Sequence, residues 1–303
     1  MIDVIITSYN EPKATLRAVQ TFLKQYTKKD LRVTVVDPFP AVGVFLHKAI
    51  KDPRFVFYPD PGEGKSYALN LLFQEYASSN KRDIFILTDG DVHVSEHTVR
   101  EIVTAFKDPH VGCVTGKPVS LDGRDTKYGF WAHVAFAGIH RVRDHLSSSG
   151  TFLECSGYLF AIRKSVILDF PLETSEDSII PYLFWKKGYG IQYVPGAEVY
   201  VKNPTTWNDW LAQKVRNVKA HENLKHIAPD MPRTKTLWHE IKHGGLYALT
   251  LPRNLKECGW LLQLYPARLY LYLKAFKELR KKKQYADGWR GDATTESTKT
   301  LDA

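Results

Sequence analysis

The sequence contains few cysteines and no long apolar run without charges. Its three cysteines, Cys113, Cys155 and Cys258, have no spacing typical of a metal site and cannot all pair with one another. We therefore expect reduced side chains that pack inside a cytosolic protein. No uncharged apolar stretch is long enough to cross a bilayer, and residues 2–7 already have a strand pattern. These features predict neither a transmembrane helix nor a signal peptide.

Acidic residues are scarcer than basic ones. There are 33 Asp and Glu against 42 Lys and Arg, which gives a formal net charge of +9. This excess favours anionic partners such as a nucleotide sugar, a phospholipid surface or nucleic acid. No recognisable nucleic-acid-binding module is present, so we expect no nucleic-acid partner. The 44% of apolar residues indicates a globular chain, long enough for one large domain or two small ones.

The first third of the chain alternates between strand and helix patterns. Strands are predicted over Val4–Ser8, Leu31–Val36, Phe55–Tyr58 and Ile84–Thr88, and helices over Lys13–Tyr26, Val42–Ile50 and Ser66–Glu75. This order predicts an α/β fold with a Rossmann-like, mostly parallel sheet and helices on both faces. Because ligands bind at the carboxyl ends of such strands, loops 7–12 and 37–40 should lie near the loop that follows Thr88.

Two carboxylates, Asp89 and Asp91, follow the apolar run Ile84–Leu87. At a separation of ~4 Å and an effective dielectric near 20, their repulsion would cost roughly 4 kcal/mol. A divalent cation removes this repulsion, and oxygen ligands suit Mg²⁺ or Mn²⁺ shared with substrate phosphates. The pair therefore predicts a clamp for a metal and a diphosphate, with a solvated acidic turn as the alternative.

Three other enzyme classes share parts of this pattern. Gly64-Lys65-Ser66 matches the end of a phosphate-binding loop, but the first glycine of that motif is replaced by Pro59, which has no N–H group. A haloacid dehalogenase would place its first Asp on the first strand, and a sugar nucleotidyltransferase would open with a glycine-rich loop. The chain has neither feature, and these readings remain minor alternatives.

Several motifs resemble, in order and spacing, those of the inverting family 2 glycosyltransferases, which have the GT-A fold. The resemblance covers roughly residues 2–220. The matching segments are Val4–Glu11, Asp37, Gly64–Asn70, Asp89–Asp91, Ser156–Arg163, Glu176-Asp177 and Gln213–Arg216.

The resemblance implies a role for each matching residue. The implied donor-binding residues are Thr7, Tyr9, Asn10, Glu11, Asp37, Lys65 and Asp89. Asp91 is the stronger of the two candidate ligands of Mg²⁺ or Mn²⁺, with Asp89 as the other. The implied catalytic residues are Asp177 as general base, with Arg216 and Gln213 at the leaving group. The implied acceptor-binding residues are Gly157, Tyr158, Glu176 and Asn217.

The candidate residues near the C-terminal end of the shared core lie on one predicted helix. This helix spans Trp207–Ile227, with Thr205 or Thr206 as N-cap. The spacing of Gln213, Arg216 and Asn217 places them on one face. In processive relatives a Trp follows the Arg, so Asn217 favours transfer of a single sugar.

The resemblance implies an inverting, metal-dependent hexosyltransferase. We expect a nucleotide-sugar donor, UDP-linked rather than GDP-linked, and a hydroxyl or phosphate of a lipid-linked or glycan acceptor. Pro38 and Phe39 after Asp37 depart from the family pattern and leave the base open. The alternative is a catalytically silent protein on the same fold that binds a nucleotide sugar or serves as a scaffold.

The C-terminal part has a different composition. We expect a catalytic domain over residues 1–228, a helical extension over 229–283 and a polar flexible tail over 284–303. Two apolar, aromatic stretches in the extension, Leu237–Leu251 and Leu255–Leu279, are followed by basic residues, which is typical of helices at a membrane interface. The aromatic residues expected at headgroup level are Trp238, Trp260, Tyr265, Tyr270 and Tyr272. The prediction is a cytoplasmic protein, peripheral at the cytoplasmic face; the alternative is packing on the catalytic domain or on a second subunit.

Overall fold

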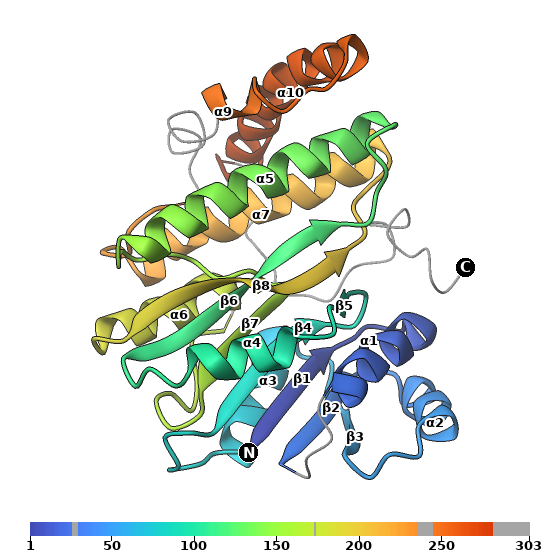
Figure 1. Ribbon diagram of the computed structural model, residues 1–303, viewed down its shortest axis with the longest axis vertical. Coiled ribbons are helices and arrows are strands. Elements are labelled where there is room, and N and C mark those ends of the chain that lie inside the picture. The colour runs from blue at the N-terminus through green and yellow to red at the C-terminus, as the bar shows by residue number, and fades with distance from the viewer. Residues whose placement is uncertain (26–29, 173, 235–244, 281–303) are drawn as a thin grey trace.

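The computed structural model describes residues 1–25, 30–172, 174–234 and 245–280. Their centre is an eight-stranded sheet of order β3-β2-β1-β4-β7-β6-β8-β5 with helices on both faces (Figure 1). The strands are β1 (Ile2–Thr7), β2 (Leu31–Asp37), β3 (Phe55–Pro59), β4 (Ile84–Asp89), β5 (His93–Val94), β6 (Val111–Ser120), β7 (Leu159–Arg163) and β8 (Gly190–Val201). The helices are α1 (Pro12–Gln25), α2 (Pro40–Ala49), α3 (Lys65–Glu75), α4 (Thr98–Ala105), α5 (Lys127–Ser148), α6 (Glu176–Lys186), α7 (Trp207–Ile227), α9 (Leu246–Ala248) and α10 (Leu255–Arg280).

The apolar runs of β1 and β4 are continuous because both faces of the sheet are covered. Along β4, Ile84 and Ile86 pack with α1, α2 and α4, whereas Phe85 and Leu87 pack with α3 and α6. All four side chains are at most 3% exposed. Successive side chains along a strand point to opposite faces of the sheet, so each strand contributes to two hydrophobic cores, one on each face.

The predicted βα order of the first third is confirmed, and element bounds agree to within about two residues. β1 pairs in parallel with both β2 and β4, and β2 pairs in parallel with β3. Beyond β4 the sheet becomes mixed, because β7 runs antiparallel between β4 and β6, and β5 is antiparallel to β8. The sheet is therefore mostly parallel, with two reversed strands that the sequence patterns did not predict.

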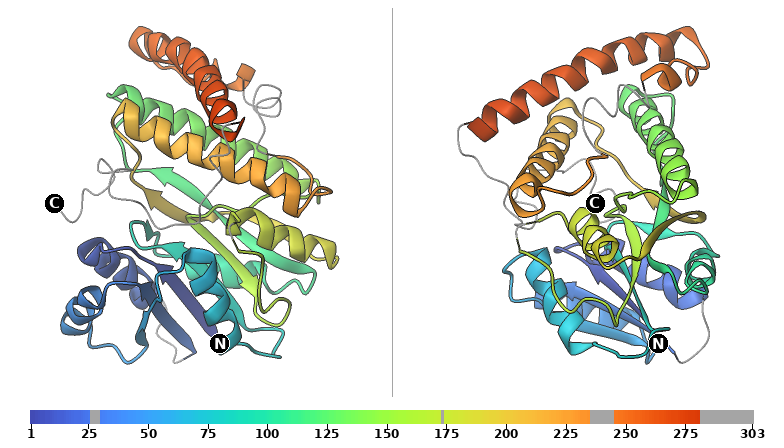
Figure 2. Two further views of the ribbon diagram at one scale, coloured as in Figure 1. Left: turned by 180° about the vertical axis from the view of Figure 1, so that it is seen from behind. Right: turned by 90° about the vertical axis from the view of Figure 1, so that its left-hand side faces the viewer.

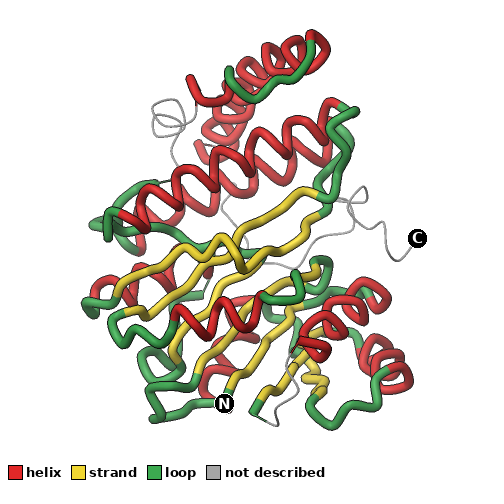
Figure 3. The backbone as a smooth tube through the Cα atoms, in the orientation of Figure 1, coloured by secondary structure: helices red, strands yellow, loops and turns green. Residues whose placement is uncertain are grey.

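Helices α5, α7 and α10 form a third packing unit above one end of the sheet. Figure 2 shows α10 lying across α5 and α7, and Figure 3 shows these long helices set apart from the strands. Trp131 of α5 donates its indole N–H to the carbonyl of Trp260 at 2.8 Å. Arg124, just before α5, forms a bidentate pair with Glu257 at 2.8 and 3.1 Å.

From residue 245 to residue 280, the predicted C-terminal extension is mainly helical and packs on the catalytic domain, as the alternative prediction had it. Leu271 and Ala275 of α10 are fully buried against α5 and α7. Tyr272 is only 5% exposed, so its predicted place at headgroup level is wrong, and Trp260 packs on Phe130 instead. None of the helices in the described ranges combines the length and apolarity needed to cross a membrane.

Three other sequence predictions can be compared with the fold. Cys113 and Cys155 are buried free thiols as predicted, but Cys258 is exposed on α10 and does not pack in the interior. Of the stretch Leu237–Leu251, only the part from residue 245 onward is described, and it contains the short helix α9. Trp238 and the tail 284–303 lie outside the described residues.

Candidate functional site

One cavity, with a volume of about 790 Å³, runs from the carboxyl ends of β1 and β4 to the space between α5, α7 and α10. Every predicted site residue lines it except Asn10 and Asp37. These residues come from β1, β4, α3, α6, α7 and the connecting loops. The fold therefore brings together side chains that are far apart in the sequence.

The inner end of the cavity lies where β1 and β4 end side by side. Thr7 is in register with Asp89, and its hydroxyl donates to Asp89 Oδ1 at 3.2 Å. The N–H of Gly90 donates to the Thr7 carbonyl at 2.8 Å. A Cβ on Gly90 would lie 2.9 Å from Thr15 Oγ1, so a glycine between the two aspartates lets this loop pack against α1.

Asp37 and Asn10 lie beside the cavity and not in its wall. Asp37 is fully buried, and its carboxylate accepts N–H bonds from Phe39 at 2.8 Å and Asn10 at 3.0 Å. Burial raises the pKa of Asp37, and these two donors together with Ser8 partly offset that effect. The carboxylate thus holds two loops together, while its contact with a nucleotide base stays a prediction. Phe39 meets the ring of Tyr9 edge-on at 5.1 Å, and Tyr9 lines the cavity.

Lys65 joins the inner end of the cavity to α6. It is the first residue of α3, after Gly64 at φ 106°, a backbone conformation that glycine adopts without strain. Its ammonium lies 2.7 Å from Asp89 Oδ1 and 2.5 Å from Glu176 Oε1. Burial alone would lower the pKa of Lys65, but the two carboxylates outweigh it and raise that pKa. Lys65 is therefore cationic, and Glu176 faces it at the inner end of the cavity.

The carboxylates at this edge fit a divalent cation that is shared with a substrate. Asp89 is paired with Lys65, and Asp91, predicted as the stronger ligand, lines the cavity two residues further along. No group of three or more His, Cys, Asp or Glu in the described part of the chain is arranged to hold a metal alone. Two carboxylates with the remaining positions taken by phosphate oxygens and water are typical of Mg²⁺ sites.

Asp177 lies in the first turn of α6, where the helix N-terminus favours a carboxylate. The hydroxyl of Ser175 donates to its Oδ1. Its backbone carbonyl accepts an N–H bond from Cys155 at 2.9 Å. A Cβ on Gly157 would lie 3.8 Å from Oδ2, so this glycine leaves space beside the second oxygen.

Arg143 of α5 is a site residue that the sequence analysis missed. It is 7% exposed, lines the cavity and donates from Nη2 to the Cys155 carbonyl at 2.8 Å. Because Cys155 in turn holds the backbone of Asp177, Arg143 supports the segment that carries the predicted base. The sequence signal was weak: an arginine in a helical stretch that also contains Arg141 is normally a solvated residue.

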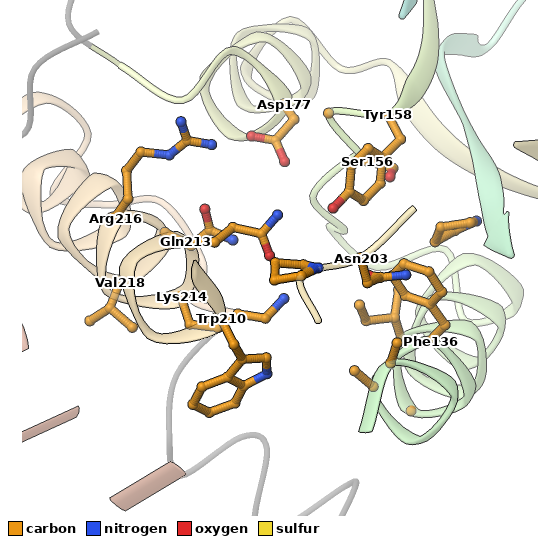
Figure 4. A pocket seen from close by; sticks show the side chains of 18 of the residues that line it. Phe136, Ser156, Tyr158, Asp177, Asn203, Trp210, Gln213, Lys214, Arg216 and Val218 are labelled. Carbon is orange, nitrogen blue, oxygen red and sulfur yellow. The ribbon is translucent and has the colours of Figure 1, made fainter. Parts of the chain in front are cut away.

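Arg216 and Gln213 reach the same space from α7. Figure 4 shows both side chains extending from that helix toward Asp177, with Tyr158 and Ser156 on the opposite side. α7 begins at Trp207 as predicted, because the hydroxyl of Thr206 accepts the N–H of Asp209 at 3.2 Å. Asn217 lines the cavity next to Arg216. The cavity therefore has a carboxylate pair at one end, and another carboxylate facing a guanidinium further along.

Residues 2–220 match the sequence profile of the family described as Glycosyltransferase like family 2. The chain belongs to this family. The match covers the whole sheet and most of α7, so every candidate site residue named above lies within it.

Two curated relatives illustrate the similarity. The N-acetylglucosaminyltransferase of Rhizobium meliloti (strain 1021) is 25% identical over 240 residues, which are 71% of this chain and 54% of the relative. The poly-beta-1,6-N-acetyl-D-glucosamine synthase of Staphylococcus aureus (strain COL) is 23% identical over 223 residues, 71% of this chain and 53% of the relative. The chain spans about half the length of these relatives.

A solved structure agrees on the fold. The mannosyltransferase PcManGT from Pyrobaculum calidifontis, in complex with GDP-Man and Mn²⁺, superposes with a TM-score of 0.60 at 18% identity. The match covers 92% of this chain and 80% of that one. The fold is therefore of the GT-A type, and the described chain ends in the helix α10.

Proposed function

We propose that this protein is an inverting glycosyltransferase that moves one sugar from a nucleotide-sugar donor to a hydroxyl or phosphate of an acceptor. The observation that carries the proposal is one cavity lined by Asp91 from the loop after β4, Asp177 from α6 and Arg216 from α7. A scaffold protein need not keep all three in one space. The non-processive assignment rests on Asn217, which replaces the aromatic residue of processive relatives.

The bonds formed and broken in the proposed transfer are assigned from the residues that line the cavity. The acceptor oxygen attacks the anomeric carbon from the side opposite the leaving group, so the configuration inverts. A carboxylate oxygen of Asp177 takes the proton of an acceptor hydroxyl. The electron pair of the broken bond stays on the departing nucleoside diphosphate. Arg216 and Gln213 stabilise that negative charge with N–H donors.

At the donor end, Asp91 and Asp89 would hold Mg²⁺ or Mn²⁺, which neutralises diphosphate charge when bound. Lys65 fixes the position of Asp89 through its 2.7 Å ion pair. Tyr9 and Phe39 offer ring surfaces near the loop where a base would lie. A UDP-sugar is the favoured donor from the family resemblance, and a GDP-sugar is the alternative that the PcManGT complex supports.

A thermal-shift screen tests the proposal. UDP- and GDP-sugars, each with and without Mn²⁺, are added to the full chain. We expect one nucleotide class to raise the unfolding temperature, with a larger increase when Mn²⁺ is present. No stabilisation by any nucleotide sugar would contradict the proposal. Mn²⁺-dependent binding without release of nucleoside diphosphate in the presence of acceptors would favour the silent binding protein.

We also propose that the outer face of α10 binds an anionic membrane surface from the cytoplasmic side. Five exposed apolar residues at helical spacing form this face: Leu255, Leu262, Leu269, Leu273 and Phe276. Their exposed fractions range from 41% to 90%. Lys274 and Lys277 flank this apolar stripe, and basic residues near exposed apolar ones favour anionic lipid headgroups.

Replacing Leu262 and Leu273 together by Glu should abolish co-sedimentation with vesicles that contain phosphatidylserine. The reason is that the change removes apolar contact and adds repulsion. Both leucines are more than 60% exposed and lie outside the cavity wall, so the fold and the donor site should survive. Val44→Glu is the matched control, since Val44 is 72% exposed on α2, at the far end of the molecule. Equal pelleting of both variants and the unaltered protein would contradict this role of α10.

A further inference from the structure

Beyond Asp177 and Arg216, the cavity continues as a channel between α5, α7 and α10. Its polar groups are concentrated near the reacting residues, whereas this part has mostly apolar side chains. The apolar residues that line it from α5 and α10 include Ala135, Ile139, Val142, Leu261, Leu264 and Leu269. Figure 2 shows α10 crossing over α5 and α7, and residues of all three helices line the cavity.

Gly138 marks an open part of this channel. It lies in the middle of α5 and lines the cavity, and a Cβ built on it would meet no atom of the described residues within 4 Å. A glycine inside a helix costs about 1 kcal/mol relative to alanine. In the described part of the chain no close neighbour explains this glycine, which leaves space in the channel wall.

The channel opens at the exposed face of α10. Tyr265 and Leu269 line the cavity and are also 40% and 54% exposed, so they belong to both surfaces. Leu269 is part of the exposed apolar stripe, one helical turn from Leu273. Arg268, which lies between Tyr265 and Leu269 in the sequence, lines the cavity as well. The apolar stripe of α10 and the apolar channel are therefore continuous at this point.

We propose that the channel holds the hydrocarbon chain of a lipid acceptor, whose polar head lies at Asp177. This proposal rests on the proposed function and selects the lipid over the soluble glycan as acceptor. A glycan would need hydrogen-bonding groups along the walls, whereas most of the side chains that α5 and α10 present there are aliphatic or aromatic. Lys214 of α7, which follows Gln213 in the sequence, lines the cavity and supplies positive charge for an anionic headgroup such as a phosphate. The chain passes directly from the α10 face into the channel.

The test is a substitution that narrows the channel at Gly138, where the channel wall leaves open space. Gly138→Leu puts a branched side chain into the open space and should favour the helix. Gly259→Leu on α10 is the matched control, because a Cβ there also meets nothing within 4 Å and Gly259 does not line the cavity. The probe is radiolabelled farnesyl phosphate, bound to the full chain in equilibrium dialysis.

We expect farnesyl phosphate to bind the unaltered protein and Gly259→Leu alike, and Gly138→Leu at least tenfold more weakly. Nucleotide-dependent thermal stabilisation should be the same in all three, which shows that Gly138→Leu is folded. If Gly138→Leu fails this folding test, Gly138→Ala replaces it and should lower affinity to a smaller degree without lowering the unfolding temperature.

Three results would overturn the channel proposal. The first is equal binding of the probe to Gly138→Leu and to the unaltered protein. The second is an equal weakening of probe binding in Gly138→Leu and Gly259→Leu. The third is binding of an oligosaccharide instead of the probe, with that binding lost in Gly138→Leu. Failure of the proposed function would give a different experimental result. In that case no nucleotide sugar would stabilise the unaltered protein, whatever the result with farnesyl phosphate.

Discussion

Asp177→Asn is expected to lower the turnover of sugar transfer by about 10²–10⁴-fold, the usual contribution of a general base. Asparagine keeps the shape of the side chain but cannot take the proton of the acceptor hydroxyl. Donor affinity should be unchanged, because the proposal places Asp177 at the acceptor and not at the diphosphate. The measurements are initial rates of nucleoside diphosphate release with acceptor present, and donor affinity by calorimetry.

Two further variants make this result specific. Asp169→Asn is the matched control, since Asp169 is exposed and outside the cavity, and it should have normal turnover. Arg216→Ala removes charge stabilisation at the leaving group, so both donor affinity and turnover should fall. Near-normal turnover of Asp177→Asn would move the base elsewhere, with Glu176 as the next candidate. Loss of donor binding together with turnover would assign Asp177 a structural role.

Asp91→Ala should abolish the Mn²⁺-dependent part of the stabilisation by nucleoside diphosphate. At a ligand concentration 100-fold above its dissociation constant, binding stabilises a protein by about 2.7 kcal/mol, which is a shift of several degrees. The variant should unfold at the same temperature as the unaltered protein when no nucleotide is present. The measurement is thermal unfolding with nucleoside diphosphate at fixed concentration, with and without Mn²⁺.

Glu96→Ala is the control for a carboxylate near this edge that does not line the cavity, and it should keep the full Mn²⁺-dependent shift. Asp89→Ala is expected to lose the shift as well, and also to leave Lys65 with Glu176 as its remaining carboxylate partner. If Asp91→Ala retains the whole Mn²⁺-dependent shift, Asp91 is not a metal ligand.

The N-terminal half of the sheet could be predicted because its signals are local. Each strand there is a short apolar run, and each helix has apolar residues at helical spacing, as in β4 and α3. The antiparallel place of β7 between β4 and β6 was missed, because that choice depends on pairings such as Leu87 with Phe160, far apart in the sequence. For α10 the apolar composition was clear, but only packing decides that Leu271 is buried and Leu273 exposed.

The candidate site, like the fold, could be predicted from the sequence only in part. The convergence of Asp89, Asp91 and Thr7 at one edge follows from strand order alone. The bridging position of Lys65 between Asp89 and Glu176 does not, since it depends on where α6 lies over the sheet. Arg143 was missed because its importance comes from burial against Cys155, which the sequence around it does not indicate.

The most direct test of inverting transfer needs no knowledge of the acceptor. Water can serve as a slow acceptor, and proton NMR follows the sugar that is released from an α-linked nucleotide sugar of the class found in the thermal-shift screen. The account predicts that the β-anomer appears first, before mutarotation, and that Asp177→Asn releases it far more slowly. Initial release of the α-anomer would contradict inversion at this site.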